Sequence, residues 1–121
     1  MTKLGEFSHI EFPADDLERA KAFYANVFGW QFSAMEGYED YFLYEAGPGG
    51  LGGGFGVRGR TAGATVRNYL GTDDIDATLG RVASSGGTVV EPKTDIGIGW
   101  YATLLDTEGN EIAVYQAKPR D

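Results

Sequence analysis

Two residues on the first predicted strand have the side chains best suited to chemistry. His9 and Glu11 stand two positions apart in a segment, residues 5–12, whose side chains alternate in character. Because successive strand residues point to opposite faces, both side chains lie on one face, about 7 Å apart along the strand. An imidazole beside a carboxylate could act as a general base with a partner that positions it. The alternative is a structural pair in which the two groups only satisfy hydrogen bonds.

The segment that carries these residues has a second copy in the chain. Residues 9–17 align with residues 67–75 at an offset of 58, and both stretches contain an Asp-Asp pair followed by an aliphatic residue. The same offset takes Gly29 to Gly87. An offset that stays constant over this distance predicts a repeated unit of strand, helix and strand.

The repeat gives each of the two chemical residues a counterpart. Arg67 corresponds to His9, and Tyr69 corresponds to Glu11. A pseudo-twofold relation between the copies would bring all four side chains together at the floor of one ligand site. Arg67 could then pair with Glu11, or it could bind an anionic ligand in bidentate fashion. Four convergent polar groups inside apolar walls are typical of a ligand site.

Each copy is predicted to contain one helix and several strands. The first helix is expected to start at Asp15, with Glu18 at capping-box spacing, and to end at Gly29. The second helix is expected to start at Asp73 and to end at Gly86-Gly87. The predicted strands are residues 5–12, 30–33, 41–44, 88–90, 100–105 and 111–116.

A glycine-rich stretch, residues 47–56, follows the predicted strand 41–44 of the first copy. Residues 47–52 match the letters G-x-G-x-x-G. A dinucleotide fingerprint requires a helix directly after the glycines, and here more glycine follows. The stretch therefore predicts a loop running into a glycine-rich strand, where another backbone or a ligand comes close.

Composition limits the classes of protein and partner. The chain has 121 residues, no cysteine, 10 basic and 18 acidic residues, and a net charge of −8. Such a charge disfavours binding to nucleic acid and to anionic membranes. No stretch approaches the roughly 20 apolar residues of a transmembrane helix. The lack of cysteine suits a reducing compartment, so we expect a cytoplasmic protein without a signal peptide.

The residues quoted above resemble a known superfamily. Residues 9–24, with Phe28-Gly29-Trp30 after them, and the later loop 106–110 are similar to the glyoxalase/bleomycin resistance protein/dioxygenase superfamily, also called vicinal oxygen chelate proteins, in its small branch related to lactoylglutathione lyase. The resemblance implies an α+β fold of two βαβββ modules that form a cupped mixed sheet, with helices on the outer face. We expect one domain over residues 1–121, with module one at about 1–60 and module two at about 65–121.

The resemblance also implies where a metal would bind. Members hold a divalent ion with a His on the first strand and a polar residue on the last strand of each module. His9 stands at the first of these positions, but Arg67 stands at its counterpart and is permanently protonated. Ala113 stands four residues after Gly109, where a Glu is expected, and Glu111 is two residues too early. A catalytic zinc site needs about three protein ligands. We therefore expect no metal cofactor, and name His9 and Glu111 as the ligands if one binds.

The resemblance implies a protein that binds a small, partly aromatic or apolar molecule in the concave face of the cup. Two alternatives remain: a metal-dependent lyase, isomerase or dioxygenase, and a metal-free enzyme that uses Glu11 or His9 as a base. The resemblance to this superfamily also suggests a homodimer. Trp30 and Phe32 are further candidates for the ligand wall, although packing is the commoner role of aromatic residues. The expected ligand-binding residues are His9, Glu11, Arg67, Tyr69, Tyr101 and Tyr115.

Overall fold

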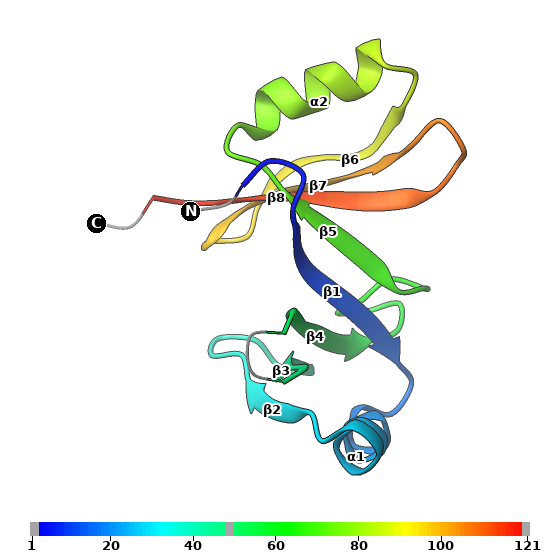
Figure 1. Cartoon of the computed structure of the whole chain (residues 1–121), viewed down its shortest axis with the longest axis vertical. Coiled ribbons are helices and arrows are strands. Elements are labelled where there is room, and N and C mark those ends of the chain that lie inside the picture. The colour runs from blue at the N-terminus through cyan, green and yellow to red at the C-terminus, as the bar shows by residue number, and fades with distance from the viewer. Residues whose placement is uncertain (1–2, 48–49, 120–121) are drawn as a thin grey trace. The chain divides into compact units, whose positions relative to one another are not determined.

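Eight strands and two helices make up the part of the chain that the computed structural model describes, residues 3–47 and 50–119 (Figure 1). They fall into two compact units. We call His9–Arg67 module one, and the N-terminal segment up to Ser8 together with the chain from Asn68 onwards module two. Both modules follow the order βαβββ, which confirms the predicted α+β fold class.

Module one builds a four-stranded sheet with one helix. Its elements are β1 (Phe7–Ala14, of which the first two residues belong to module two), α1 (Leu17–Phe28), β2 (Gln31–Ala34), β3 (Tyr41–Glu45) and β4 (Gly52–Val57). The strand order is β2-β3-β4-β1. β4 pairs with β1 in parallel, and the other two pairings are antiparallel. The glycine-rich stretch is thus an inner strand, as the sequence indicates.

Helix α1 begins one residue later than the sequence predicts. Asp16, not Asp15, is the N-cap, and its Oδ1 accepts a hydrogen bond from the backbone N–H of Arg19 at 3.0 Å. Asp16 has the extended backbone that this role requires, with φ −137° and ψ 104°. The predicted end is confirmed, because Gly29 adopts the left-handed conformation, with φ 73°.

An aromatic cluster joins α1 to the sheet of module one, and the ring of Tyr24 on α1 lies 5.2 Å from that of Phe55. The rings of Phe12 and Phe55 lie 5.1 Å apart, and those of Trp30 and Tyr44 stack at 4.4 Å. Phe32 joins the cluster at 5.7 Å from Phe55. Trp30 and Phe32 therefore pack their rings on this cluster, and both remain partly exposed. The opposite face of this sheet is left for polar residues.

Module two repeats the arrangement. Its elements are β5 (Arg67–Gly71, whose first residue belongs to module one), α2 (Ile75–Ser84), β6 (Thr88–Asp95), β7 (Gly99–Leu105) and β8 (Glu111–Ala117). The strand order is β5-β8-β7-β6, with β5 parallel to β8. Strand β6 is longer than the predicted 88–90 because the ladder to β7 continues past two irregularities in register.

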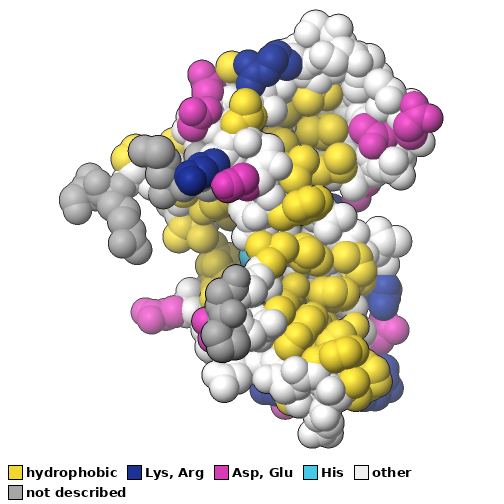
Figure 2. All heavy atoms as spheres, viewed as in Figure 1, with side chains coloured by type: hydrophobic (Ala, Val, Ile, Leu, Met, Phe, Trp, Pro, Cys, Tyr) yellow, Lys and Arg dark blue, Asp and Glu magenta, His cyan; other side chains and the backbone are white. Residues whose placement is uncertain are grey.

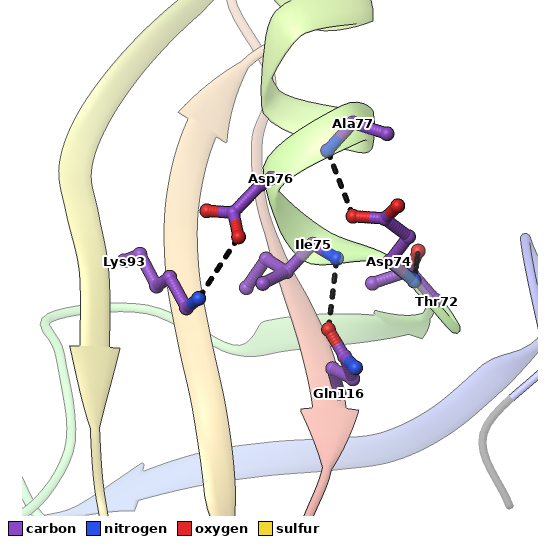
Figure 3. A network of polar contacts seen from close by, with 7 residues as sticks. All are labelled: Thr72, Asp74, Ile75, Asp76, Ala77, Lys93 and Gln116. Carbon is purple, nitrogen blue, oxygen red and sulfur yellow. Dashed lines mark hydrogen bonds and ion pairs between the residues drawn. The ribbon is translucent and has the colours of Figure 1, made fainter.

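The start of α2 shows the same one-residue correction. Asp74, not Asp73, accepts a hydrogen bond from the backbone N–H of Ala77 at 3.0 Å (Figure 3). The helix N-terminus is also bound to the sheet, because the N–H of Ile75 donates to the side chain of Gln116 at 2.9 Å. Ile75 is 1% exposed and anchors an apolar core. That core contains Ala102, Leu104 and Val114, flanked by Leu79, Val82, Trp100 and Ile112.

Neither helix of the described chain has the length and hydropathy needed to cross a membrane. Both are amphipathic elements that lie on a sheet.

Candidate functional site

One face of the module one sheet lies away from α1, and we call it the polar face. Strand register decides its membership, because paired residues share a face. Glu11 pairs with Gly54, Gly54 with Leu43, and Leu43 with Ser33. The residues of this face are His9 and Glu11 on β1, Gln31 and Ser33 on β2, Tyr41, Leu43 and Glu45 on β3, and Gly52, Gly54 and Gly56 on β4.

Strand β4 presents only glycine to the polar face, and the packing explains why. A Cβ at Gly52 would approach the backbone oxygen of Tyr44 to 2.6 Å. A Cβ at Gly54 would clash with the ring and hydroxyl of Tyr41. The strand therefore forms a floor without side chains between β3 and β1. The prediction that something approaches this strand closely is confirmed: a backbone carbonyl and a phenol do so.

The phenol of Tyr41 crosses this glycine floor and joins the two predicted chemical residues. Its hydroxyl donates a hydrogen bond to Oε2 of Glu11 at 2.8 Å. The same oxygen lies 2.8 Å from Nε2 of His9. The rings of His9 and Tyr41 are nearly parallel, at 8°. Glu11, Tyr41 and His9 thus form a chain of carboxylate, phenol and imidazole, which we call the Tyr41 relay.

The relay fixes the state of the imidazole. Tyr41 has a single hydroxyl hydrogen, and it points to Glu11, so the phenolic oxygen accepts from the Nε2–H of His9. The lone pair of a neutral ring then resides on Nδ1. Burial lowers the pKa of His9 from 6.5 to about 4, because desolvation disfavours the charged form. His9 is therefore neutral at pH 7. Glu11 is 6% exposed, and hydrogen-bond donors such as the Tyr41 hydroxyl offset the cost of burying its carboxylate.

A pocket of about 400 Å³ opens on the polar face. The residues of the polar face that line the pocket are His9 on β1, Gln31 and Ser33 on β2, and Leu43 and Glu45 on β3. Phe32, Tyr44 and Gly53 border it between those positions. The volume lies within the range of small-molecule sites. Module one alone therefore supplies a hollow of ligand size next to the Tyr41 relay.

The other residues predicted for the site fall into both modules. Arg67 closes module one, and its guanidinium lies near Gly63, where an added Cβ would meet Nη2 at 3.3 Å. Tyr69 belongs to module two, where its ring lies 6.5 Å from that of Tyr101. The structure brings His9 and Glu11 together through Tyr41. A common floor of His9, Glu11, Arg67 and Tyr69 remains a prediction.

Module two has its own polar cluster at the matching positions. Tyr101 donates to Oε2 of Glu91 at 3.2 Å, and the hydroxyl of Thr103 donates to Oε1 of the same carboxylate at 3.1 Å. Thr103 is fully buried. Tyr115 pairs with Tyr101 across the ladder and directs its hydroxyl to the carbonyl of Ile98 at 3.4 Å. Tyr101 and Tyr115 are thus held by contacts within module two.

The residues at the expected metal positions do not fit a metal. The Nε2–H of His9 is committed to Tyr41. Ala113 is fully buried and pairs with Tyr69, so a methyl group stands where an oxygen ligand is required. Glu111 pairs with Leu105 at the far start of β8. Across residues 3–47 and 50–119, no group of three or more His, Cys, Asp or Glu side chains could hold a metal ion.

The sequence analysis missed Tyr41, although a signal for it existed. The strand pairings make Tyr41 the counterpart of Tyr101. Tyr41 pairs with the residue two positions after Gly54 on β4, and Tyr101 pairs with the residue two positions after Ala113 on β8. These tyrosines are 60 residues apart, whereas the first strands repeat at 58. A fixed offset pairs Tyr41 with the wrong residue. Allowing the offset to change between elements would have singled out Tyr41.

Comparison with known protein families gives one clear match. The family model described as Glyoxalase/Bleomycin resistance protein/Dioxygenase superfamily matches residues 6–114. A glyoxylase-like domain-containing protein of Didymella fabae is 32% identical over 118 residues, which are 91% of this chain and 92% of that protein. A relative from Mycobacterium bovis is 28% identical over 123 residues, and the chain spans 44% of its length.

Solved structures show the same architecture. Methylmalonyl-CoA epimerase from Mycobacterium tuberculosis superimposes with a TM-score of 0.72 at 18% identity, covering 98% of this chain and 93% of that one. At this identity the likeness concerns the fold. The arrangement of strands and helices is therefore shared, while the side chains of the polar face have to be interpreted on their own.

Proposed function

We propose that this chain, which belongs to the glyoxalase/bleomycin resistance protein/dioxygenase superfamily, binds a small molecule on the polar face of module one. The observation that carries the proposal is the pocket of about 400 Å³ beside the Tyr41 relay. Gly53 of β4 borders the hollow, and the ring of Tyr41 covers the neighbouring Gly54. Leu43 supplies apolar contact, and Gln31, Ser33 and Glu45 supply polar groups. Such a mixture of one apolar wall and a few polar groups suits a small organic ligand.

The protonation state of the relay favours binding over catalysis. A general base works best when its pKa lies near the working pH. The pKa of His9 is lowered to about 4, which makes the imidazole a weak base at pH 7. A neutral His9 held by Tyr41 is instead a rigid, partly buried wall for a ligand.

A metal-free enzyme is the second candidate, and the hydrogen bond from Tyr41 to Glu11 favours it. A buried carboxylate next to a phenol could receive a proton from a carbon acid. This activity would exchange a C–H hydrogen of a bound ligand with solvent deuterium, and proton NMR would detect the loss of its signal. Glu11→Gln would abolish the exchange. Binding without exchange would exclude this candidate for the ligand tested.

A fragment screen by two-dimensional NMR tests the proposed binding. We expect fragments that bind to shift the backbone amides of Ser33, Leu43 and Gly53 together, since all three line the pocket. Ser33→Trp would fill the hollow from the exposed strand β2 and abolish those shifts. Ala34→Trp is the matched control, because position 34 is on the same strand and the opposite face. Fragments that bind both variants equally would refute the proposed site.

We also propose that the protein acts without a metal and forms a homodimer. The first proposal is supported by the poor fit of Arg67 and Ala113 to a metal site. The second is supported by hydrophobic side chains at the surface, which Figure 2 shows in yellow. Phe23, Val27 and Phe28 of α1 are 54%, 56% and 61% exposed. Light scattering that gives the 13.0 kDa of one chain would refute the dimer.

A further inference from the structure

The charge at the module one pocket is negative. Glu45 is a lining carboxylate, and the lining residues within the described chain include no Lys or Arg. Glu45 pairs with Gln31 across β2 and β3, so both side chains stand at the same end of the hollow. The pocket thus offers a negative charge with hydrogen-bonding neighbours at one end and Leu43 further along the strand.

His9 does not offset this charge. An imidazole in a pocket wall could attract an anion if it were protonated at pH 7. Burial instead lowers the pKa of His9 to about 4, so the ring is neutral under ordinary conditions. A ligand carboxylate or phosphate would gain no charge pairing from this side chain.

Three basic side chains close in sequence to the pocket strands have acidic partners. Arg58, directly after β4, pairs with Asp15 at 3.0 Å. Lys21 lies 3.5 Å from Glu18 on α1 and over the ring of Phe42. Arg60 pairs with Asp40 in the loops. The net charge of −8 adds a long-range attraction for cations. The local and the overall charge therefore act in the same direction.

From this arrangement we infer that the pocket selects a small organic cation, an amine with a flat or apolar body. The ammonium group would pair with Glu45, and Gln31 and Ser33 would accept its remaining hydrogen bonds. The body would lie against Leu43 and the backbone of Gly53. The inference rests on the proposed binding function and adds the chemical class of the ligand to it. Anionic ligands are disfavoured at this site.

Three probes of matched shape test the charge preference: benzylamine, benzyl alcohol and benzoate. Each is titrated into the protein at pH 7 and low salt while the amides of Ser33, Leu43 and Gly53 are followed by NMR. Since an exposed ion pair is worth little, we expect benzylamine to bind about fivefold more tightly than benzyl alcohol. Benzoate should bind most weakly. Added salt should reduce the advantage of the amine.

Variants assign the preference to one carboxylate. Glu45→Gln should remove the advantage of benzylamine over benzyl alcohol, measured as the ratio of their two dissociation constants. Glu18→Gln removes the same charge from α1, against the other face of the sheet, and should keep the preference. If benzoate or benzyl alcohol binds as tightly as benzylamine, the cation preference is wrong although the pocket binds ligands. If none of the three probes shifts the pocket amides, the binding function itself is refuted, and the inference with it.

Discussion

The hydroxyl of Tyr41 and the carboxylate of Glu11 are 2.8 Å apart, although the residues are 30 positions apart in the chain. Two strand pairings place them there. β3 pairs with β4, and β4 pairs with β1, so the phenol must reach across one whole strand. It can do so because position 54 on that strand is glycine. The relay therefore depends on the strand order, on a missing side chain and on an aromatic residue of the right length.

Tyr41→Phe should destabilise the protein by about 2 kcal/mol, as expected when a hydrogen bond to a buried charged group is lost. The ring remains, so packing changes little, and Glu11 loses one donor in a site where it is 6% exposed. Urea denaturation measures the change in the free energy of unfolding. Tyr24→Phe is the control, since the hydroxyl of this half-buried tyrosine makes no hydrogen bond within the described residues, and it should change stability by less than about 0.5 kcal/mol. Equal effects in both variants would contradict the role of the relay.

Stability should fall as the pH drops from about 6.5 to about 4. In this window the unfolded chain protonates its histidine, with a pKa of 6.5, while the folded His9, with a pKa of about 4, stays neutral. The unfolded state then binds more protons, so stability rises with pH across the window, by about 3 kcal/mol for this residue. Carboxylates titrate in the same range, so the wild type is compared with His9→Gln, which should lose less stability over the window.

The chain has a single histidine, which makes this pKa directly measurable. The Cε1 proton of His9 should give one NMR signal whose titration midpoint lies near pH 4. A midpoint at the ordinary 6.5 would show that the ring is solvated and that the relay is open in solution.

Local rules and the repeat predicted most of the helices and strands, and the resemblance supplied the βαβββ arrangement of each module. Alternation in residues 5–12 predicted β1, now Phe7–Ala14, and the Asp-Asp pairs predicted helix starts to within one residue. The one-residue error arose because either aspartate of a pair can cap by composition, and only backbone conformation distinguishes them. The glycine run was correctly interpreted as a strand with a close neighbour.

The pocket could not be predicted in the same way. His9 and Glu11 were identified from alternation within one strand, which is local information. Tyr41, Leu43 and Glu45 reach them only through the register of β3 on β4 and of β4 on β1. Register depends on hairpin lengths, and these differ between the modules, as the change of offset shows. A site shared by four strands therefore required the structure.

Purified protein should contain no stoichiometric zinc, nickel, iron or manganese. Of the positions expected to carry metal ligands, Arg67 is a permanent cation and Ala113 has no donor atom. Elemental analysis after gel filtration measures the metal content per chain. One bound ion per chain that is lost in His9→Ala would overturn the prediction. Glu111→Ala would then show whether the other named candidate takes part.

Gly54→Ala should displace the Tyr41 ring, because the added methyl group would overlap its hydroxyl end. We expect a loss of about 2 kcal/mol, comparable to Tyr41→Phe, since the same hydrogen bond to Glu11 breaks. The effect should depend on Tyr41: in a Tyr41→Ala background the same substitution should cost less than about 1 kcal/mol, because residues in contact are not additive. Gly80→Ala in α2 is the control. It meets no atom within 4 Å and should stabilise by about 0.5–1 kcal/mol. Denaturation of the wild type, Gly54→Ala, Tyr41→Ala and the double variant gives the coupling energy. An equal cost of Gly54→Ala in both backgrounds would show that the glycine is required by the backbone and not by the phenol.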